Sequence, residues 1–498
     1  MIAPYDAALL QSLQAGFASA ATELFIDGRF VPAASGETFE VIDPATGRVF
    51  ARSAAGAAED VDRAVTAARR AFEGSWARTS PAQRARLMIR LAELIERDGA
   101  AIALTETLDN GMPFMMAKVA GVMGASEQLR YNAGWATRIT GETVEPSAPG
   151  EWHCFTLREP VGVVGAIVPW NFPFVMAVAK IAPALAAGCT VVLKPAEQTP
   201  LSAVHLGRLI AEAGFPEGVV NIVTGFGTTA GAAIVDHPGI DKISFTGSTQ
   251  VGKSIVRAAT GTLKRVTLEL GGKSPVMIFA DADLARAIPA AAMGIFMNAG
   301  QVCAAGSRLF VHEQVYDQVL DGVQAMARGL RVGPGLSPDT QMGPLVSRRQ
   351  LDRVLGYIET GAGEGAVIGV GGAAIAGEGY FIQPTVLTNT IAGMTVMEEE
   401  IFGPVLCATR FGDEDIDLVA GRANDTRYGL SSRIWTRDLS TALRLTRRLK
   451  AGGVMVNGRA GVDPALPMGG YKQSGWGREN GRAGVEAYTE IKTVQIAL

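Results

Sequence analysis

The sequence is poor in cysteine, in net charge and in long apolar runs, and each shortage excludes a class of protein. Its 498 residues contain four cysteines, which lie far apart at Cys154, Cys189, Cys303 and Cys407. This spacing excludes a CxxC zinc site and a disulfide framework, and it fits a reducing cytoplasm. The net charge of −4 gives no reason to expect nucleic acid or an anionic membrane as a partner.

No segment predicts a membrane span or a secretory signal. The most apolar stretch, FVMAVAKIAPALAAGCTVVL, is interrupted by Lys180 and Pro183, whereas a span needs about 20 consecutive apolar residues. The start of the chain, MIAPYDAALLQSLQAGFASA, contains no lysine or arginine and so lacks the basic region of a signal peptide. We therefore expect a cytoplasmic protein without a membrane partner.

The length and the apolar pattern predict two α/β domains that join near Gly271. A chain of 498 residues exceeds the roughly 250–300 residues at which a single core stops growing. Strand-like apolar runs alternate with helical patterns, as in doubly wound parallel sheets. The runs lie at 161–170, 189–194, 219–224, 241–245 and 266–270, and then at 274–279, 307–312, 403–411, 431–436 and 452–458. Ser80, Pro81 and Gln83 form a capping-box signature that predicts a helix start.

A glycine-rich loop follows the third strand-like run. In VTGFGTTAG, Gly225 and Gly227 resemble the start of a dinucleotide-binding fingerprint, but the third glycine is Gly231, one place late. A tight strand–helix turn explains the pattern equally well, so both interpretations stay open.

Two other loops after strands are candidates for binding a dinucleotide. In FTGSTQVG, Ser248 could support phosphate binding at a helix N-terminus, or it could simply cap that helix. In KPAEQTP, Lys194 and Glu197 stand beyond the carboxyl end of a strand, where a carboxylate can hold ribose hydroxyls. A solvated charged loop is the alternative for that segment.

Cys303 stands among small residues in the segment GQVCAAGS at 300–307. Small residues allow the backbone to turn tightly and allow a ligand to approach the sulfur. A free cysteine is more often a small buried apolar residue. This segment alone therefore leaves a structural and a chemical role open.

Seven motifs together resemble those of the aldehyde dehydrogenase superfamily, in its order and over nearly the whole chain. They are PWNFPF, KPAEQTP, FTGST, LELGGKSP, GQVCAAGS, EEIFGPV and GGYKQSGWGRE. GWATRITGE and GPGLSP…GPLVS look most similar to bacterial phenylacetaldehyde dehydrogenase-like members. The resemblance implies two Rossmann-like α/β domains and a small β-flap for oligomerisation. It places an NAD-binding domain at 1–136 and 158–270, a catalytic domain at 271–470 and the bridging element at 137–157 and 485–498.

The resemblance also implies a role for individual residues. Cys303 becomes the nucleophile, Glu269 the general base and Asn171 the oxyanion donor, while Lys180 and Glu479 support the water path. NAD is the expected cofactor, and the residues expected around it are Trp170, Lys194, Glu197, Gly227, Ser248, Gln350, Glu400 and Phe402. The residues expected to line the aldehyde tunnel are Phe172, Met176, Ala179, Val462 and Met468. No metal is expected.

The chemistry explains why these residue types are needed. An aldehyde releases hydride readily only after a thiolate has added to it, and the oxyanion that forms needs donors such as the amide of Asn171. The thioester that remains needs a carboxylate to activate water. Leu268 and Leu270 place Glu269 on a buried strand rather than at the surface. Asn171 alone could be a turn residue before Pro173.

The expected reaction is oxidation of an aldehyde to the carboxylic acid with NAD. The apolar tunnel residues, with the small Ala179, favour an aryl or arylalkyl aldehyde such as phenylacetaldehyde. Two alternatives stay open: a CoA-acylating relative would generally lack the base at Glu269, and a non-catalytic binding protein should have lost Cys303 or Glu269. The strand-like C-terminus predicts pairing with a neighbouring chain and hence a homo-oligomer, either a dimer or a tetramer.

Overall fold

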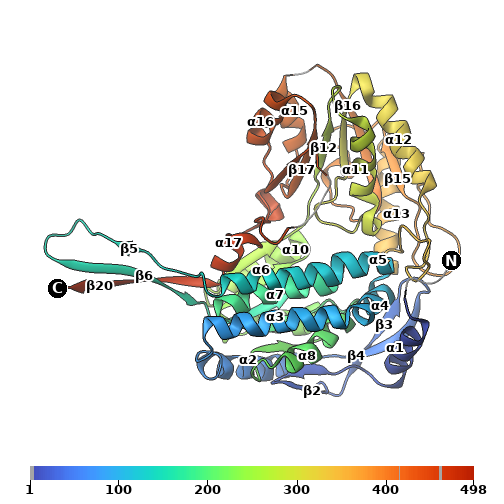
Figure 1. Cartoon of the computed structure of the whole chain (residues 1–498). Coiled ribbons are helices and arrows are strands. Elements are labelled where there is room, and N and C mark those ends of the chain that lie inside the picture. The colour runs from blue at the N-terminus through green and yellow to red at the C-terminus, as the bar shows by residue number, and fades with distance from the viewer. Residues whose placement is uncertain (1–4, 414, 459–462) are drawn as a thin grey trace.

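The computed structural model describes residues 5–413, 415–458 and 463–498. Two α/β bodies lie together, and a long β-arm that ends at the C-terminus projects away from them (Figure 1). The described residues contain no helix that is both long and apolar enough to cross a membrane. They also contain no group of three or more His, Cys, Asp or Glu side chains that could hold a metal ion.

The first body is built on a sheet with the strand order β19-β11-β10-β7-β8-β9-β1-β2. The central strands β11 to β9 are parallel, whereas β19, β1 and β2 are added antiparallel at the edges. The strands are β1 (Leu24–Ile26), β2 (Arg29–Val31), β7 (Val163–Ile167), β8 (Thr190–Lys194), β9 (Val220–Ile222), β10 (Lys242–Thr246), β11 (Arg265–Glu269) and β19 (Gly475–Trp476). The strands predicted in the first half of the sequence are thus confirmed.

Helices cover both faces of this sheet. One apolar core contains residues of α3, α6, α7 and α8, and a second core contains residues of α2, α9 and α10 with alternate residues of the same strands. The helices are α1 (Ala7–Ser19), α2 (Ala58–Glu73), α3 (Pro81–Arg97), α4 (Gly99–Asn110), α5 (Phe114–Met116), α6 (Gly124–Trp135), α7 (Pro173–Ala187), α8 (Leu201–Ala213), α9 (Ala232–Asp236), α10 (Thr249–Ala259) and α17 (Gly481–Glu486), with π-helices η1 (Ala117–Met123) and η2 (Gly227–Gly231). The capping box of α3 is confirmed, because Ser80 N–H donates to Gln83 Oε1 at 2.9 Å.

The second body repeats the plan with the strand order β14-β15-β16-β13-β12-β17-β18. All neighbouring pairs are parallel except β14 with β15. The strands are β12 (Pro275–Ile278), β13 (Arg308–His312), β14 (Val367–Val370), β15 (Thr385–Thr388), β16 (Val405–Phe411), β17 (Ser431–Trp435) and β18 (Gly453–Val456). The helices are α11 (Leu284–Phe296), α12 (Tyr316–Gly329), α13 (Arg348–Gly363), α14 (Thr395–Glu398), α15 (Ile416–Asn424) and α16 (Leu439–Arg448), with 3₁₀ turns η3 (Met297–Gly300), η4 (Glu313–Val315) and η5 (Lys472–Ser474).

The arm is a small sheet with the order β20-β6-β5. Its strands are β5 (Thr143–Val144), β6 (Trp152–Pro160) and β20 (Thr489–Ala497), and β20 pairs antiparallel with β6 along its whole length. The predicted C-terminal strand is confirmed, and its partner within the chain is β6. Strand β6 continues to Pro160, past the expected boundary at 157. A separate hairpin joins β3 (Thr38–Asp43) to β4 (Arg48–Ala54).

Candidate active site

Cys303 lies in a tight turn between η3 and β13. The preceding residues Asn298, Ala299 and Gly300 have φ angles of 51°, 52° and 71°, so the backbone passes through the left-handed region before it reaches Gln301. Alanine rarely adopts this conformation, and Ala299 is held in it while only 1% exposed. The turn leaves Cys303 partly exposed as a residue, although protein atoms surround its sulfur.

Two glycine-containing segments close around this turn. A Cβ on Gly272 would lie 2.3 Å from the carbonyl oxygen of Cys303, and a Cβ on Gly300 would lie 2.0 Å from that of Gly403. The N–H of Gly272 donates to Glu400 Oε1 at 2.9 Å. These contacts bring the motifs LELGGKSP, GQVCAAGS and EEIFGPV together in space.

Burial and negative charge keep the Cys303 thiol protonated at rest. Burial, Glu400 and Glu269 raise the pKa of this thiol to about 12, above the ~8.5 of a free cysteine. Burial also raises the pKa of Glu400 to about 7, so this carboxyl can hold or release a proton near neutrality. A proton acceptor is therefore needed before Cys303 can attack as a thiolate.

Asn171 reaches the cysteine turn from the segment before α7. Its Nδ2 donates to the carbonyl oxygen of Gln301 at 2.8 Å, and its own carbonyl oxygen accepts from Asn298 Nδ2 at 2.8 Å. Gln301 in turn accepts from the N–H of Val346 at 2.9 Å through Oε1. Asn298 and Gln301 are buried polar residues that the sequence does not single out, because a loop amide has neither periodicity nor charge to distinguish it.

Glu269 ends β11 with a buried carboxyl. The residue is 2% exposed, and neither of its carboxylate oxygens has a hydrogen-bond partner in the described part of the chain. Burial and the negative charge of Glu479 raise its pKa well above the usual value, while Lys180 and Arg478 act to lower it. Such a carboxyl, with both oxygens free to accept, is suited to take a proton from water.

The buried Lys180 forms an ion pair with the partly buried Glu479, and both charges act on that carboxyl. Ser244 Oγ donates to Glu479 Oε1 at 3.4 Å, and Tyr488 OH donates to Ser244 Oγ at 3.2 Å. The backbone of Met468 pairs with that of Glu479. Met468 N–H donates to the Glu479 carbonyl oxygen at 2.7 Å, and Glu479 N–H donates to that of Met468 at 2.8 Å. Ser244 and Tyr488 could not be predicted from the sequence, since no motif distinguishes a strand serine or a tyrosine before the arm.

Lys194 and Glu197 form a second polar group where β8 ends. Lys194 is 2% exposed, and its Nζ donates to the carbonyl oxygen of Pro195 at 2.6 Å and to Glu197 Oε2 at 3.4 Å. This burial excludes a solvated loop as the explanation for Lys194. The side chain of Glu197 remains 31% exposed, so its carboxylate can also accept hydrogen bonds from a ligand.

Ser248 and Gly227 occupy the starts of two helical segments in this region of the first body. Ser248 is exposed and caps α10, where its Oγ accepts from Val251 N–H at 3.3 Å. A Cβ on Gly227, at the start of η2, would meet no described atom within 4 Å. Gly225, by contrast, has a φ of 147°, and its Cβ would lie 2.4 Å from the carbonyl oxygen of Gly56. The first glycine therefore serves a tight turn.

Trp170, Phe402 and Gln350 meet at one cluster. The rings of Trp170 and Phe402 pack edge to face, with centroids 5.2 Å apart and an interplanar angle of 85°. Gln350 Nε2 donates to the carbonyl oxygen of Phe402 at 2.7 Å, and Arg353 Nη2 donates to that of Glu400 at 2.7 Å. Helix α13 thus fixes the backbone of the segment that carries Glu400 and Phe402.

Phe172, Met176 and Ala179 lie on one face of the start of α7. Their spacing of four and then three residues places them above one another on a helix. Phe172 is 9% exposed, while Met176 and Ala179 keep partial exposure in a helix whose other residues are mostly buried. Val462, the remaining expected tunnel residue, lies outside the described residues.

Comparison with known proteins identifies the family of this chain. The model of the "Aldehyde dehydrogenase family" matches residues 30–494. The putative aldehyde dehydrogenase DhaS of Bacillus subtilis is 51% identical over 483 residues, which cover 97% of each chain. The mitochondrial aldehyde dehydrogenase of Homo sapiens is 49% identical over 95% of this chain and 92% of its own length. The structure of the NAD⁺ complex of aldehyde dehydrogenase from Bacillus cereus has a TM-score of 0.96 at 47% identity and covers 100% of both chains. The chain therefore belongs to the aldehyde dehydrogenase family.

Proposed function

We propose that Cys303, Asn171 and Glu269 carry the chemistry of this NAD-dependent aldehyde dehydrogenase, and that its product is the carboxylic acid. The observation that carries the proposal is their convergence on one turn. Asn171 donates to the carbonyl oxygen of Gln301, two residues before Cys303, at 2.8 Å, and the charge of Glu269 acts on the Cys303 thiol. A nucleophile, an oxyanion donor and a base are the groups that acyl chemistry on sulfur requires.

In the first step the sulfur of Cys303 adds to the aldehyde carbon. A C–S bond forms, the thiol proton passes to a carboxylate of the site, and the carbonyl oxygen becomes an oxyanion. The amide of Asn171 has two N–H bonds. Because Gln301 accepts only one of them, the other can donate to the oxyanion. Removal of one such donor typically slows catalysis about a hundred- to a thousandfold.

The chain's own residues fit a dinucleotide. The exposed helix start at Ser248 provides donors, and the free space beside Gly227 provides room. The partly exposed carboxylate of Glu197 provides acceptors. Glu197 favours NAD over NADP because a carboxylate repels a 2′-phosphate. When bound, NAD supplies the acceptor for the hydride that the sulfur-bound carbon loses. The residues that would hold it are Lys194, Glu197 and Gly227 at the adenosine, Ser248 and Trp170 at the phosphates, and Gln350, Glu400 and Phe402 at the nicotinamide half.

In the last step Glu269 takes a proton from water, and the oxygen attacks the thioester carbon. The C–S bond breaks, the carboxylic acid leaves, and Cys303 regains a proton. Lys180 lowers the pKa of Glu269, which increases the fraction of this carboxyl that is ionised and able to act as a base. The ion pair with Glu479 holds Lys180 in place for this purpose.

We further propose that the substrate is an aryl or arylalkyl aldehyde such as phenylacetaldehyde. The described tunnel residues Phe172, Met176, Ala179 and Met468 are apolar, and thioethers make favourable contacts with aromatic rings. None of these four residues carries a charge that could hold a trimethylammonium group. Burial of one ring beyond a methyl group is worth about 1.5–3 kcal/mol, or on the order of ten- to a hundredfold in kcat/KM.

The test is NADH formation by the purified protein with phenylacetaldehyde, acetaldehyde and betaine aldehyde, each with and without CoA. We expect the highest kcat/KM for phenylacetaldehyde and no dependence on CoA. Cys303→Ala should abolish NADH formation and keep NAD binding. Equal values for the three aldehydes would refute the proposed substrate, a CoA requirement would favour an acylating enzyme, and turnover by the Cys303→Ala variant would refute the nucleophile.

We propose a separate function for each α/β body and for the arm. We assign NAD binding to residues 1–136 and 158–270, catalysis to 271–470, and oligomerisation to the arm at 137–157 and 485–498. Strand β20 lies at the edge of the arm's sheet, so its outer side can pair with another chain. Leu157 and Ile491 on the arm are 41% and 61% exposed, which supports an apolar contact with a second copy in a dimer or tetramer.

A further inference from the structure

We propose that helix α4 positions the oxyanion donor, with Asn110 and Glu106 as positioning residues that hold the segment Trp170–Phe174. The inference rests on the proposed role of Asn171. It adds two residues, more than 60 positions earlier in the sequence, whose side chains determine where that amide points.

Helix α4 has an unusual set of buried polar residues. Its second half contains five polar side chains that are at most 2% exposed, namely Thr105, Glu106, Thr107, Asp109 and Asn110. Buried polar groups are costly unless they are hydrogen-bonded, so the partners of each group show what it stabilises. Thr105 and Thr107 only bond back to carbonyl groups of their own helix.

Glu106 and Asn110 instead bond to both ends of the segment that contains Asn171. Asn110 Nδ2 donates to the carbonyl oxygen of Trp170 at 2.6 Å. Glu106 Oε1 accepts from the N–H of Phe174, in the first turn of α7, at 2.8 Å. The two residues lie four positions apart, on one face of α4, and thus hold the backbone on either side of Asn171.

A third bond connects the segment to the turn of Cys303. The carbonyl oxygen of Asn171 itself accepts from Asn298 Nδ2 at 2.8 Å. The backbone is therefore held at Trp170, Asn171 and Phe174, and the Asn171 side chain has little freedom to swing away from the turn of Cys303. Catalytic geometry tolerates little error, since a displacement of about 1 Å can slow a reaction a hundredfold.

Gly121 and Ser202 help to keep the carboxyl of Glu106 in this position. A Cβ on Gly121, in the π-helix η1, would lie 2.7 Å from Glu106 Oε2, so glycine at this position leaves room for the carboxyl. Ser202 Oγ donates to Glu106 Oε1 at 3.1 Å. Asp109 Oδ2 accepts from Leu201 N–H at 3.2 Å and so ties α4 to the start of α8.

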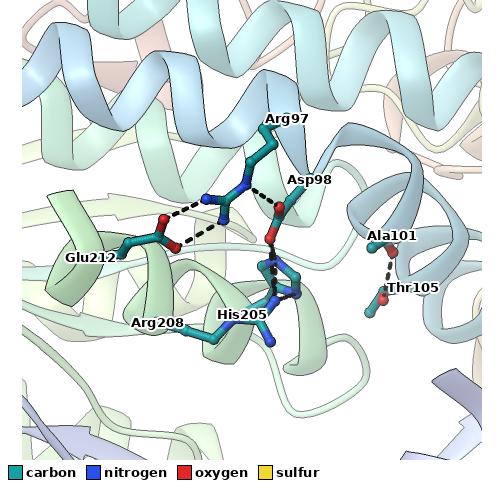
Figure 2. A network of polar contacts seen from close by, with 7 residues as sticks. All are labelled: Arg97, Asp98, Ala101, Thr105, His205, Arg208 and Glu212. Atoms are coloured by element: carbon teal, nitrogen blue, oxygen red, sulfur yellow. Dashed lines mark hydrogen bonds and ion pairs between the residues drawn. The ribbon is translucent and has the colours of Figure 1, made fainter. Parts of the chain in front are cut away.

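The other end of α4 is anchored as well. Figure 2 shows Asp98, at the junction of α3 and α4, bonded to Arg97 and to His205 of α8. Arg97 also donates to Glu212 of α8 through Nη2 at 2.8 Å. With both ends of α4 tied to α8, the helix forms a fixed support from which Asn110 and Glu106 reach the catalytic segment.

The test compares Asn110→Asp with Thr107→Val in the full-length protein. Asn110→Asp keeps the acceptor for Met112 N–H but places an oxygen opposite the Trp170 carbonyl. At saturating NAD we expect the rate of the first-turnover NADH burst to fall about ten- to a hundredfold. A deuterium isotope effect from the 1-deuterated aldehyde should appear in steady state. Thr107→Val removes a bond within α4 and should leave the burst rate within twofold.

A double-mutant cycle shows whether Asn110 acts through Asn171. Asn110→Asp should slow the burst strongly in the native protein but hardly further in the Asn171→Ala background. Additive effects, an unchanged burst rate in Asn110→Asp, or an equal loss in Thr107→Val would each overturn the proposal. If Asn171→Ala alone leaves the burst unchanged, the proposed function of Asn171 fails instead.

Three further variants protect the test against a folding defect. Glu106→Leu should slow the burst, and Glu106→Gln, which keeps an acceptor for Phe174 N–H, should recover most of the loss. Asn298→Asp removes the hydrogen bond to the Asn171 carbonyl oxygen and leaves α4 unchanged. If Asn110→Asp does not fold, a normal burst rate in Asn298→Asp and no difference between the two Glu106 variants would refute the proposal.

Discussion

Replacing Glu269 by glutamine should lower activity and raise stability in the same protein. The carboxyl of Glu269 is 2% exposed, and both of its oxygens are without hydrogen-bond partners among the described residues. Glutamine has nearly the same shape, but it cannot accept a proton from water. The exchange therefore removes the proposed base and at the same time removes a buried charge.

The loss of activity follows from the role of a general base. Such a base contributes about a hundred- to ten-thousandfold to a rate, which corresponds to about 2.7–5.5 kcal/mol in the barrier. Because the loss falls on thioester hydrolysis, the first turnover should still occur. We expect Glu269→Gln to release one NADH per active site in a burst and then to turn over at a much reduced steady rate.

The gain in stability follows from the raised pKa of Glu269. A carboxyl whose pKa is higher in the folded state binds its proton more tightly there than in the unfolded chain. Its stabilising effect is complete below the unfolded pKa of about 4.3 and is lost as the pH rises through the folded pKa. Between those two values the native protein should lose up to about 1.4 kcal/mol of stability per pH unit relative to the variant.

Stopped-flow NADH fluorescence and urea unfolding from pH 4 to pH 8 measure the two effects. The variant should show the burst, and its advantage in free energy of unfolding should grow with pH. Steady turnover equal to that of the native protein would show that another group acts as the base. A stability difference that does not change with pH would refute the raised pKa.

Two other substitutions test the electrostatics of the turn and the role of the arm. Glu400→Gln removes a negative charge that raises the pKa of the Cys303 thiol, so iodoacetamide should alkylate Cys303 faster at pH 8 without NAD. Mass spectrometry of the modified peptide measures the alkylation rate. A rate equal to or slower than that of the native protein would contradict the prediction. Ile491→Lys together with Leu157→Lys replaces exposed apolar side chains of the arm and should convert an oligomer to smaller species by light scattering, whereas an unchanged mass would exclude these residues from the contact.

Much of the fold could be predicted because its strands carry a local signal. The central strands β7, β8 and β10 are buried at every position, and such strands read as continuous apolar runs. The start of α3 could also be predicted, since the capping box of Ser80 and Gln83 is contained in four consecutive residues. Each of these features depends only on neighbours in sequence.

The support of the site could not be predicted, because it depends on contacts between distant residues. Asn171 is hydrogen-bonded to Gln301 and Asn298, which are 130 and 127 positions away in the sequence. Asn110 is hydrogen-bonded to Trp170, 60 positions away. The position of Gln301 also depends on positive φ angles at Asn298 and Ala299. An alanine in the sequence gives no indication of a positive φ angle. Family motifs indicated the candidate catalytic residues, whose roles stay predictions, but they gave no sign of the amides that hold them.

The small residues at 300–307 predict a tight turn and room for a ligand, whereas Gly271 and Gly272 belong to the separate motif LELGGKSP. The structure brings both segments together with Glu400 around Cys303. A Cβ on Gly271 would lie 2.4 Å from Glu400 Oε2, whereas a Cβ on Gly272 would lie 2.3 Å from the Cys303 carbonyl oxygen. A carboxylate at the end of a flexible side chain can move aside, but a backbone carbonyl in a strained turn cannot move without its residue. One methyl group at Gly271 would therefore change the charge beside the sulfur, and one at Gly272 would change the position of the sulfur itself.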